Sequence, residues 1–141
     1  GIERRLLPDA EAIVEHLAPA FGLLLATNGI ADVQRRRFEV AAVGRHFADI
    51  VISDEIGVAK PDPRYFDVAF ARMGSPPRSE VLMVGDSLSS DMAGGIAYGI
   101  DTCWFNPGRR SNGVESRPTY EIHRLMDLLD IVEADPGHRV R

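Results

Sequence analysis

The sequence predicts an α/β fold in which a doubly wound parallel sheet is covered by helices on both faces. Short, largely apolar runs occupy residues 23–26, 49–52, 81–84 and 102–105, and such runs are typical of buried strands. The longer segments between them carry apolar residues at helical spacing. Strands that alternate with helices are joined by right-handed crossovers, which makes neighbouring strands parallel.

The predicted helices have recognisable starts and ends. Pro8 lies near the start of the first helix. Asp62 can cap a helix that has Pro63 at its first position and Gly74 after its last residue. The expected helices span about residues 6–17, 32–46, 63–73, 90–98 and 120–129, with a loop at residues 53–61 and a frayed polar tail at residues 133–141.

Composition narrows the class of protein. The chain has 141 residues, the size of a single domain. Its 16 basic side chains are outnumbered by 21 acidic ones, and the net charge of -5 argues against a nucleic-acid binder, which usually presents a basic face. Its apolar runs fall short of the ~18 residues that a membrane span needs. The single cysteine, Cys103, excludes an intrachain disulfide, is expected to be buried and suits a cytoplasmic location.

Polar residues follow the predicted strands at the edge of the sheet where ligands bind. Thr27 and Asn28 come directly after residues 23–26, and a hydroxyl with free turn amides can donate to an anion. An Asn-Gly pair is also a common turn without any such role. Lys60 precedes Pro61, whose stiff backbone fixes the direction of the chain, although a lone lysine is more often solvated.

The strongest signal is a pair of carboxylates. Asp86 lies just past the predicted strand 81–84, and Asp91 falls in the first turn of the following helix. Two carboxylates ~4 Å apart repel by about 4 kcal/mol at an effective dielectric constant near 20, so one takes up a proton or a cation binds between them. Oxygen ligands of this kind suit Mg²⁺. The alternative is that Asp91 offsets the helix dipole while Asp86 caps a turn.

Taken together, these residues provide a coherent chemistry. Thr27 would contact an anion, Lys60 would supply positive charge, and Asp86 and Asp91 would hold a divalent cation. A cation, a lysine and a hydroxyl donor are what phosphoryl transfer requires, because positioning and charge neutralisation provide most of its catalysis. The sequence therefore predicts a site for a phosphorylated small molecule and Mg²⁺.

The same segments resemble the haloacid dehalogenase (HAD) superfamily of hydrolases. LLLATNG, VAKPDPRYFDVAF and VLMVGDSLSSDMAGG are similar to its second, third and fourth motifs, in matching order, and the resemblance covers about residues 6–107. It implies a Rossmann-like core. The segments GVAKPDP, VGDSLSSDMAGG and GIDTCWFNPG are similar to those of the branch that contains pyrimidine nucleoside monophosphate phosphatases. That branch implies a nucleoside monophosphate as substrate.

The resemblance also implies residue roles. Thr27 would bind the transferring phosphoryl group with help from Asn28, and Lys60 would stabilise both the phosphate and the nucleophilic carboxylate. Asp86 would ligate Mg²⁺, and Asp91 would ligate it or orient its ligands. Ser87 is a weaker candidate for binding a water on the metal.

The first motif of the superfamily is missing from the chain. This motif is an Asp-x-Asp pair after a central strand, and its first Asp is the nucleophile. No such pair lies upstream of Leu23, and Asp9 falls in a predicted helix. The helical cap that selects substrate is missing too. The chain therefore resembles one partial HAD domain, residues 1–141, and we expect it to be inactive by itself.

Loss of that strand has a structural consequence. In the superfamily it lies between the strands predicted here at residues 81–84 and 23–26, so two inner edges would carry unpaired backbone groups. Three outcomes are open. The two strands pair directly, another chain supplies a strand, or the sequence is incomplete, which we favour. For the isolated piece we expect a homodimer through these edges.

Other functions fit part of the pattern. A receiver domain of two-component systems shares the doubly wound sheet and acidic pocket, but its acidic pair precedes its Thr or Ser and its Lys, the reverse of the order here. A regulatory or binding domain that kept the HAD fold, and a haloacid dehalogenase, remain alternatives. The loop of residues 107–118 can bring Arg109 and Arg110 to the pocket, or it can simply be solvated.

Overall fold

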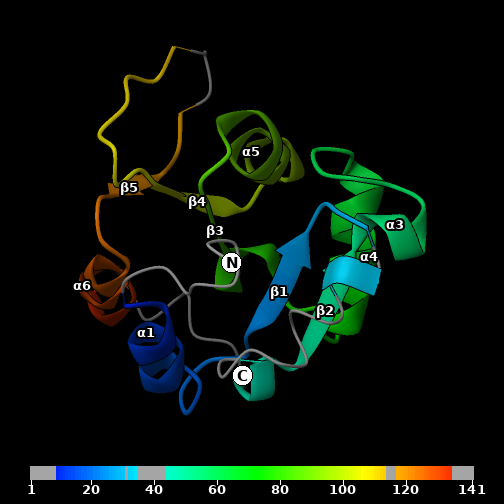
Figure 1. Ribbon diagram of the computed structural model, residues 1–141, viewed down its shortest axis with the longest axis horizontal. Helices are drawn as coiled ribbons and strands as arrows, with labels where there is room; N and C mark the ends of the chain where they lie inside the picture. The colour runs from blue at the N-terminus through cyan, green and yellow to red at the C-terminus, as the bar shows by residue number, and fades with distance from the viewer. Residues whose placement is uncertain (1–8, 31, 35–43, 114–116, 135–141) are drawn as a thin grey trace.

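The strands form parallel sheets, as the sequence predicts. The computed structural model describes residues 9–30, 32–34, 44–113 and 117–134 (Figure 1). One sheet pairs β1 (Leu24–Thr27) with β2 (Asp49–Ile52), and the other has the order β3 (Leu82–Gly85), β4 (Asp101–Phe105), β5 (Tyr120–Ile122). Every pairing is parallel. Each sheet therefore presents the carboxyl ends of its strands at one edge, where the candidate site residues follow.

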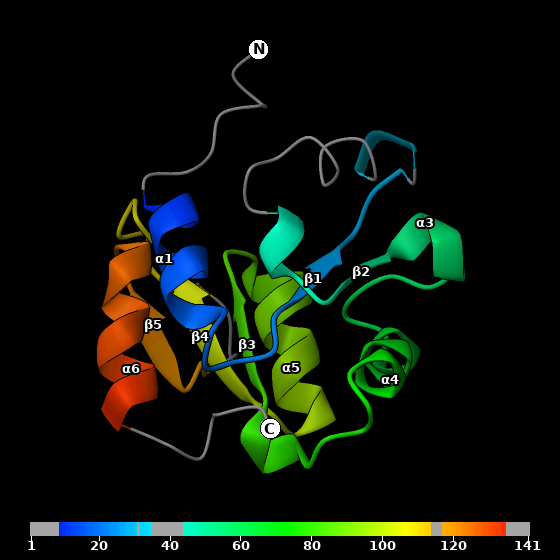
Figure 2. The ribbon, with the colours of Figure 1, turned by 90° about the horizontal axis from the view of Figure 1, so that it is seen from below.

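Helices cover both faces of the three-stranded sheet. The helices are α1 (Ala10–Leu17), α3 (Ser53–Ile56), α4 (Pro63–Arg72), α5 (Ala93–Tyr98) and α6 (Leu128–Ala134). Figure 2 shows α1 and α6 on one side of β3, β4 and β5, with α5 on the other. A core on the first side contains Ile13 of α1, Cys103 of β4 and Leu128 of α6. The doubly wound arrangement is therefore confirmed, and Cys103 is buried as expected.

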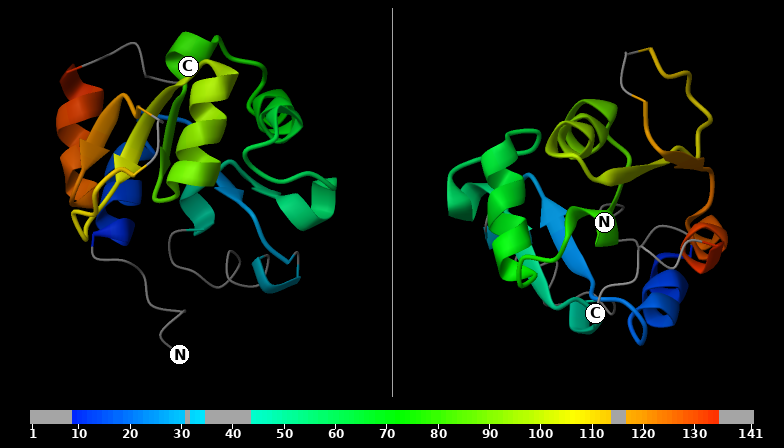
Figure 3. Two further views of the ribbon diagram at one scale, coloured as in Figure 1. Left: turned by 90° about the horizontal axis from the view of Figure 1, so that it is seen from above. Right: turned by 180° about the vertical axis from the view of Figure 1, so that it is seen from behind.

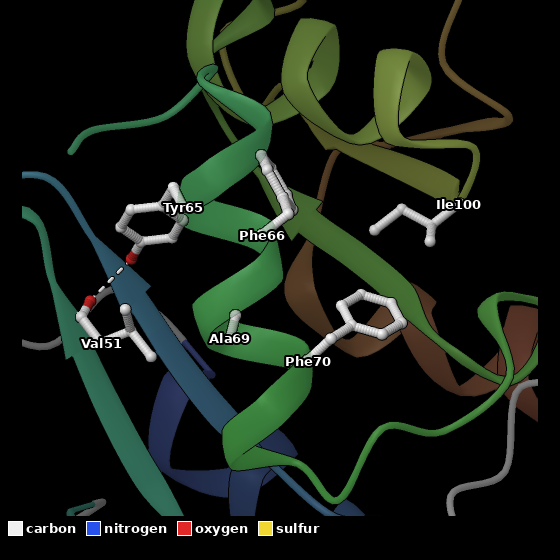
Figure 4. Packing of buried hydrophobic residues seen from close by; sticks show 6 residues of the cluster. All are labelled: Val51, Tyr65, Phe66, Ala69, Phe70 and Ile100. Atoms are coloured by element: carbon white, nitrogen blue, oxygen red, sulfur yellow. Dashed lines mark hydrogen bonds between the residues drawn. The ribbon is translucent and has the colours of Figure 1, made fainter. Parts of the chain in front are cut away.

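Helix α4 begins and packs as its sequence dictates. The Asp62 carboxylate accepts a hydrogen bond from the Arg64 amide at 2.9 Å, and Pro63 occupies the first helical position. One face of the helix buries Tyr65, Phe66, Ala69 and Phe70 against β2 and Ile100 (Figure 4). The Tyr65 hydroxyl donates to the Val51 carbonyl at 2.6 Å. Figure 3 shows α4 beside β2 and, separately, α5 beside β3 and β4.

The prediction of a helix at residues 120–129 is wrong for its first three residues. Residues Tyr120–Ile122 form β5, which pairs with β4 through Cys103↔Tyr120 and Phe105↔Ile122. Three residues are too few to show the alternation of polar and apolar side chains that marks a strand. This segment becomes a strand because it pairs with β4. A 3₁₀ turn, Leu125–Asp127, then leads into α6. Because α6 runs to Ala134, the start of the expected tail is helical, and residues 135–141 lie outside the described residues.

Other boundaries also differ from the expectation. The predicted loop at residues 53–61 begins with α3, whose acidic first turn complements the helix dipole and which ends at Gly57 with φ 79°. The helix expected at residues 90–98 begins instead with a π-helical turn, Leu88–Met92, that continues into α5. Of the helix expected at residues 32–46, residues 32–34 are helical and Gly44–His46 form a 3₁₀ turn, while residues 35–43 lie outside the described residues.

Within the described residues, β1 and β3 each have one edge without a partner strand. Among the strands that the structure describes, β1 pairs with β2 alone and β3 with β4 alone. Direct pairing of β1 with β3, the first of the three expected outcomes, therefore does not occur. Both strands are half-buried. Within the described ranges, no helix has the length and apolarity to cross a membrane.

Candidate active site

Lys60 and Asp91 form the centre of the candidate site. The Lys60 Nζ donates to Asp91 Oδ1 at 2.7 Å and to the carbonyl of Ala26, near the end of β1, at 2.8 Å. The two charged side chains are only 6% and 9% exposed. The solvated lysine that a lone residue of this type suggests is therefore not found. A buried charge needs a partner of opposite sign, and each of these residues provides it for the other.

Asn28 positions the backbone of Lys60. Its Nδ2 donates to the Lys60 carbonyl at 3.1 Å, and its Oδ1 accepts from the Lys60 amide at 3.0 Å. The Lys60–Pro61 peptide bond is cis. This two-point contact fixes the turn after β1 to the start of the lysine segment. The side chain of Asn28 is therefore committed to holding Lys60 in place.

Thr27 closes the β1 side of the site. Its hydroxyl makes one long contact, 3.4 Å to the Asn28 carbonyl, at an exposed position. Its own carbonyl accepts from the Tyr65 hydroxyl at 3.3 Å, and burial raises the pKa of Tyr65 above its ordinary value. The following turn is held by Ser53, whose Oγ accepts from the Gly29 amide at 2.9 Å. The backbone around Thr27 is thus fixed, while its hydroxyl can still turn toward a ligand.

The turn after β3 folds Asp91 back toward the strand. Asp91 lies in the π-helical turn, and its Oδ2 accepts from the Ser87 amide at 3.3 Å. The Ser87 hydroxyl accepts in turn from the Ser90 amide at 3.1 Å. A Cβ at Gly85 would overlap the Asp91 carboxylate, so only glycine fits at this position. The last residue of β3 therefore decides whether Asp91 can reach Lys60.

Asp86 differs from Asp91 in its surroundings. Its backbone carbonyl accepts from Trp104 Nε1 at 3.1 Å, and its side chain is exposed. Within the described part of the chain, the Asp86 carboxylate has no hydrogen-bond partner. It lies at a pocket of about 440 Å³ lined by Asp86, Ser87, Leu88, Ser89 and Arg110. Asp86 is therefore available to a ligand, whereas both oxygens of Asp91 already have protein donors.

These residues fit part of a magnesium site. Mg²⁺ is usually bound by one or two carboxylates together with waters and substrate phosphate. The exposed, unpartnered carboxylate of Asp86 suits this role, and Asp91 suits that of an orienting neighbour. No group of three or more His, Cys, Asp or Glu side chains able to hold a metal occurs among the described residues. The described residues therefore offer too few ligands for a closed metal site.

Three residues that shape the site were not identified from the sequence. Gly85 makes room for Asp91, Trp104 holds the Asp86 backbone, and Asn106 is fully buried after β4. The rule that polar residues at strand ends form ligand sites would have found Asn106, which directly follows the apolar run of β4. No local pattern singles out Trp104 or Gly85, because their roles depend on contacts across the fold.

Comparison with known proteins gives the family. The family model described as haloacid dehalogenase-like hydrolase matches residues 2–99. The HAD-hydrolase YfnB of Bacillus subtilis is 35% identical over 131 residues, covering 93% of this chain and 56% of that protein. The pyrimidine 5'-nucleotidase YjjG of Escherichia coli is 38% identical over 122 residues, covering 86% and 54%. The chain thus spans about half the length of the curated relatives it matches.

Solved structures agree with this assignment. A crystal structure of YfnB from Bacillus subtilis, described as bound to magnesium, superposes with a TM-score of 0.88 at 36% identity and covers 92% of this chain and 57% of that one. A 2-haloacid dehalogenase from Pseudomonas syringae gives a TM-score of 0.81 at 33% identity, covering 92% and 54%. The receiver-domain alternative is therefore excluded. The chain belongs to the haloacid dehalogenase-like hydrolases.

Proposed function

We propose that this chain provides the metal-binding and phosphate-binding half of a Mg²⁺-dependent phosphohydrolase that acts on phosphomonoesters. The observation that carries the proposal is the buried Lys60–Asp91 ion pair, with 2.7 Å between Nζ and Oδ1. This pair fixes an ammonium group where the ends of β1 and β3 meet. A cation held rigidly at that edge is suited to the charge of a transferring phosphoryl group.

Lys60 would act through its remaining hydrogen. An ammonium group has three donors, and Asp91 and the Ala26 carbonyl take two of them. The third is available to a phosphoryl oxygen. The Thr27 hydroxyl would donate to another oxygen of the same group, with Asn28 holding the loop. Paired with the Asp91 carboxylate, Lys60 would stabilise the charge of the transferring group.

Asp86 would be the direct protein ligand of Mg²⁺. When bound, Mg²⁺ neutralises charge on the phosphoryl oxygens that face it. Asp86 would hold the ion at the end of β3, and Asp91 would orient the Ser87 amide and Lys60 around it. The Ser87 hydroxyl accepts from the Ser90 amide with one lone pair, and its second lone pair would suit a metal-bound water.

The nucleophile is not among the residues of this chain. No Asp-x-Asp pair precedes β1, and the site residues described above contain no carboxylate free to attack phosphorus while Asp86 binds metal. We therefore propose that the chain alone has no phosphatase turnover. The edges of β1 and β3, which have no partner among the described strands, would instead favour a homodimer. Sedimentation showing a monomer at all concentrations would contradict the dimer.

The substrate class follows from resemblance and not from the site. Two relatives, YjjG of Escherichia coli and PynA of Streptococcus pneumoniae, are pyrimidine 5'-nucleotidases, which supports a nucleoside monophosphate as substrate. Other relatives include a phosphoserine phosphatase from Thermus thermophilus. Phosphomonoester hydrolysis is the function common to these proteins. The cytoplasmic location stays a prediction.

A phosphatase assay with Mg²⁺ tests the proposal. The chain is compared with a version extended upstream through one further strand, on an aryl phosphate and on pyrimidine monophosphates. Turnover in the extended version alone, lost in its Lys60→Met variant, would support a split active site. Turnover by the short chain would mean that the nucleophile lies within it. No turnover by either version would favour the binding-domain alternative. Release of halide from a 2-haloacid without Mg²⁺ would favour a dehalogenase.

A further inference from the structure

We infer that Arg110 binds a second anionic group on the substrate, carried by the part of the molecule that leaves the phosphoryl group. This inference rests on the proposed phosphohydrolase function. In contrast to the nucleoside monophosphate that the resemblance suggests, it takes a substrate class from the pocket itself. The preferred phosphomonoesters would carry a carboxylate or a second phosphate in addition to the phosphoryl group that is transferred. Arg110 would give this preference from the loop after β4, where Asn106 holds its backbone.

Arg110 lines the same pocket as the proposed metal ligand. The pocket of about 440 Å³ is formed by Asp86 and the three residues after it, and Arg110 is its one basic lining residue. The Arg110 side chain is exposed. Within the described part of the chain, its guanidinium has no ion-pair partner. An exposed arginine that lines a pocket and forms no ion pair there can bind an anionic ligand.

Asn106 fixes the backbone of Arg110. The Asn106 Nδ2 donates to the Arg110 carbonyl at 2.8 Å, and its Oδ1 accepts from the Arg110 amide at 3.0 Å. Asn106 is 0% exposed, and its own amide donates to the Ile122 carbonyl of β5 at 2.8 Å. A buried side chain thus holds both backbone groups of one exposed arginine. Such a contact reduces the conformational freedom that Arg110 would lose on binding a ligand.

One strand positions both Asp86 and Arg110. Trp104, in β4, donates to the Asp86 carbonyl, and Asn106 follows it two positions later. Asn106 directly follows Phe105, the last residue of β4, and its side chain binds the Arg110 backbone. The backbones of Asp86 and Arg110 are therefore both held by side chains at the end of β4.

The order of the strands determines which part of the substrate Arg110 would meet. Thr27 ends β1, Asp86 follows β3, and Arg110 follows β4, which is the next strand in the sheet. The phosphoryl group would lie between Thr27 and Asp86, so Arg110, in the loop after β4, would meet a part of the substrate on the far side of Asp86 from Thr27. A positive charge in this loop suits an anion attached to the phosphoryl group through a short carbon chain.

The neighbouring Arg109 faces a different group and provides a matched control. The pKa of the Glu121 carboxyl is lowered by a hydrogen bond from Asn106, by one from His123 and by the positive charges of His123 and Arg109. Arg109 has a left-handed backbone with φ 52°, which turns the chain between the two arginines. It is not part of the pocket lining. Removing either arginine changes the net charge equally, but only Arg110 lies at the pocket.

A titration of the 141-residue chain in Mg²⁺ tests the inference. The probes are phosphoglycolate and hydroxyethyl phosphate, which differ only in a carboxylate against a hydroxymethyl group. Backbone amide shifts of residues 86–89 and 110 report binding. We expect phosphoglycolate to bind about fivefold more tightly, the effect of one partly exposed ion pair. Arg110→Gln should abolish this preference without weakening hydroxyethyl phosphate binding, whereas Arg109→Gln should retain it.

The outcomes separate this inference from the proposed function. Equal binding of both probes by the unchanged chain, or a preference that survives Arg110→Gln, would overturn the role of Arg110 and leave the phosphate site standing. Equal weakening of both probes by Arg110→Gln would show a general charge effect and would overturn it too. Failure of both probes to bind near Asp86 would overturn the phosphate site, and the inference with it.

Discussion

The Lys60 ammonium and the Asp91 carboxylate approach to 2.7 Å, although 31 positions of sequence separate them. Lys60 also donates to the Ala26 carbonyl of β1, while Asp91 belongs to the turn after β3. The pair therefore joins two sheets that share no ladder of hydrogen bonds among the described strands. Stability and the proposed chemistry depend on the same contact, so variants of it affect both.

Lys60→Met should destabilise the fold strongly. It leaves the Asp91 carboxylate, only 9% exposed, without its positive partner. Breaking a buried pair in this way costs about 3–5 kcal/mol of the free energy of unfolding. Urea denaturation followed by circular dichroism measures the loss. The double variant Lys60→Met, Asp91→Leu removes both charges and should recover most of the stability, and a double variant no more stable than the single one would contradict this explanation.

Gly85→Ala should displace Asp91. A Cβ at this position overlaps the carboxylate, so the turn after β3 must shift. Overpacking of this kind costs about 1–3 kcal/mol of stability, measured by urea denaturation. Gly113→Ala is the matched control, since its Cβ would meet nothing within 4 Å. A Gly85→Ala variant as stable as the control would show that the turn accommodates the methyl group.

Trp104 should report Mg²⁺ binding at Asp86. It is the only tryptophan of the chain, and its Nε1 donates to the Asp86 carbonyl at 3.1 Å. An ion on the Asp86 carboxylate changes the field at the indole, so its fluorescence should respond to Mg²⁺ in the millimolar range. Asp86→Asn should abolish the response, while Glu11→Gln, an exposed acid in α1, should retain it. An unchanged response in Asp86→Asn would place the ion elsewhere.

Stability should fall in alkaline solution because of Cys103. Burial raises the pKa of its thiol from 9.0 to about 12. Above pH 9 the unfolded chain therefore loses a proton that the folded chain keeps, and the free energy of unfolding falls as pH rises. The slope for one such group is about 1.4 kcal/mol per pH unit. Urea denaturation between pH 8 and 11 measures it, and Cys103→Ala should show a shallower slope.

Tyr65 contributes to the same alkaline loss, since burial raises its pKa as well. The difference in slope between the unchanged chain and Cys103→Ala isolates the thiol, because both proteins retain Tyr65. Identical slopes would show that the thiol of the folded chain ionises as readily as that of the unfolded chain. A thiol reagent at pH 8 should also react with Cys103 only after urea is added.

The sequence by itself determined the strands and most of the candidate residues. The predicted run 49–52 coincides with β2, the runs 23–26 and 81–84 begin and end one residue before β1 and β3, and the run 102–105 lacks the first residue of β4. Largely apolar runs must be buried, and the Asp62 cap acts over three residues, so both are visible locally. Thr27, Lys60, Asp86 and Asp91 were found for a related reason, since polar residues at strand ends gather at one edge of a parallel sheet.

Only the tertiary structure decided how those residues are used. Lys60 is buried because its partners, Ala26 and Asp91, come from 34 and 31 positions away. β5 forms because its three residues pair with the edge of β4, and the sequence of three residues does not predict this pairing. Arg110 faces the pocket because Asn106 is buried between β4 and β5 and holds its backbone. Periodicity and capping are short-range effects, whereas charge pairing and strand pairing depend on which segments the crossovers bring together.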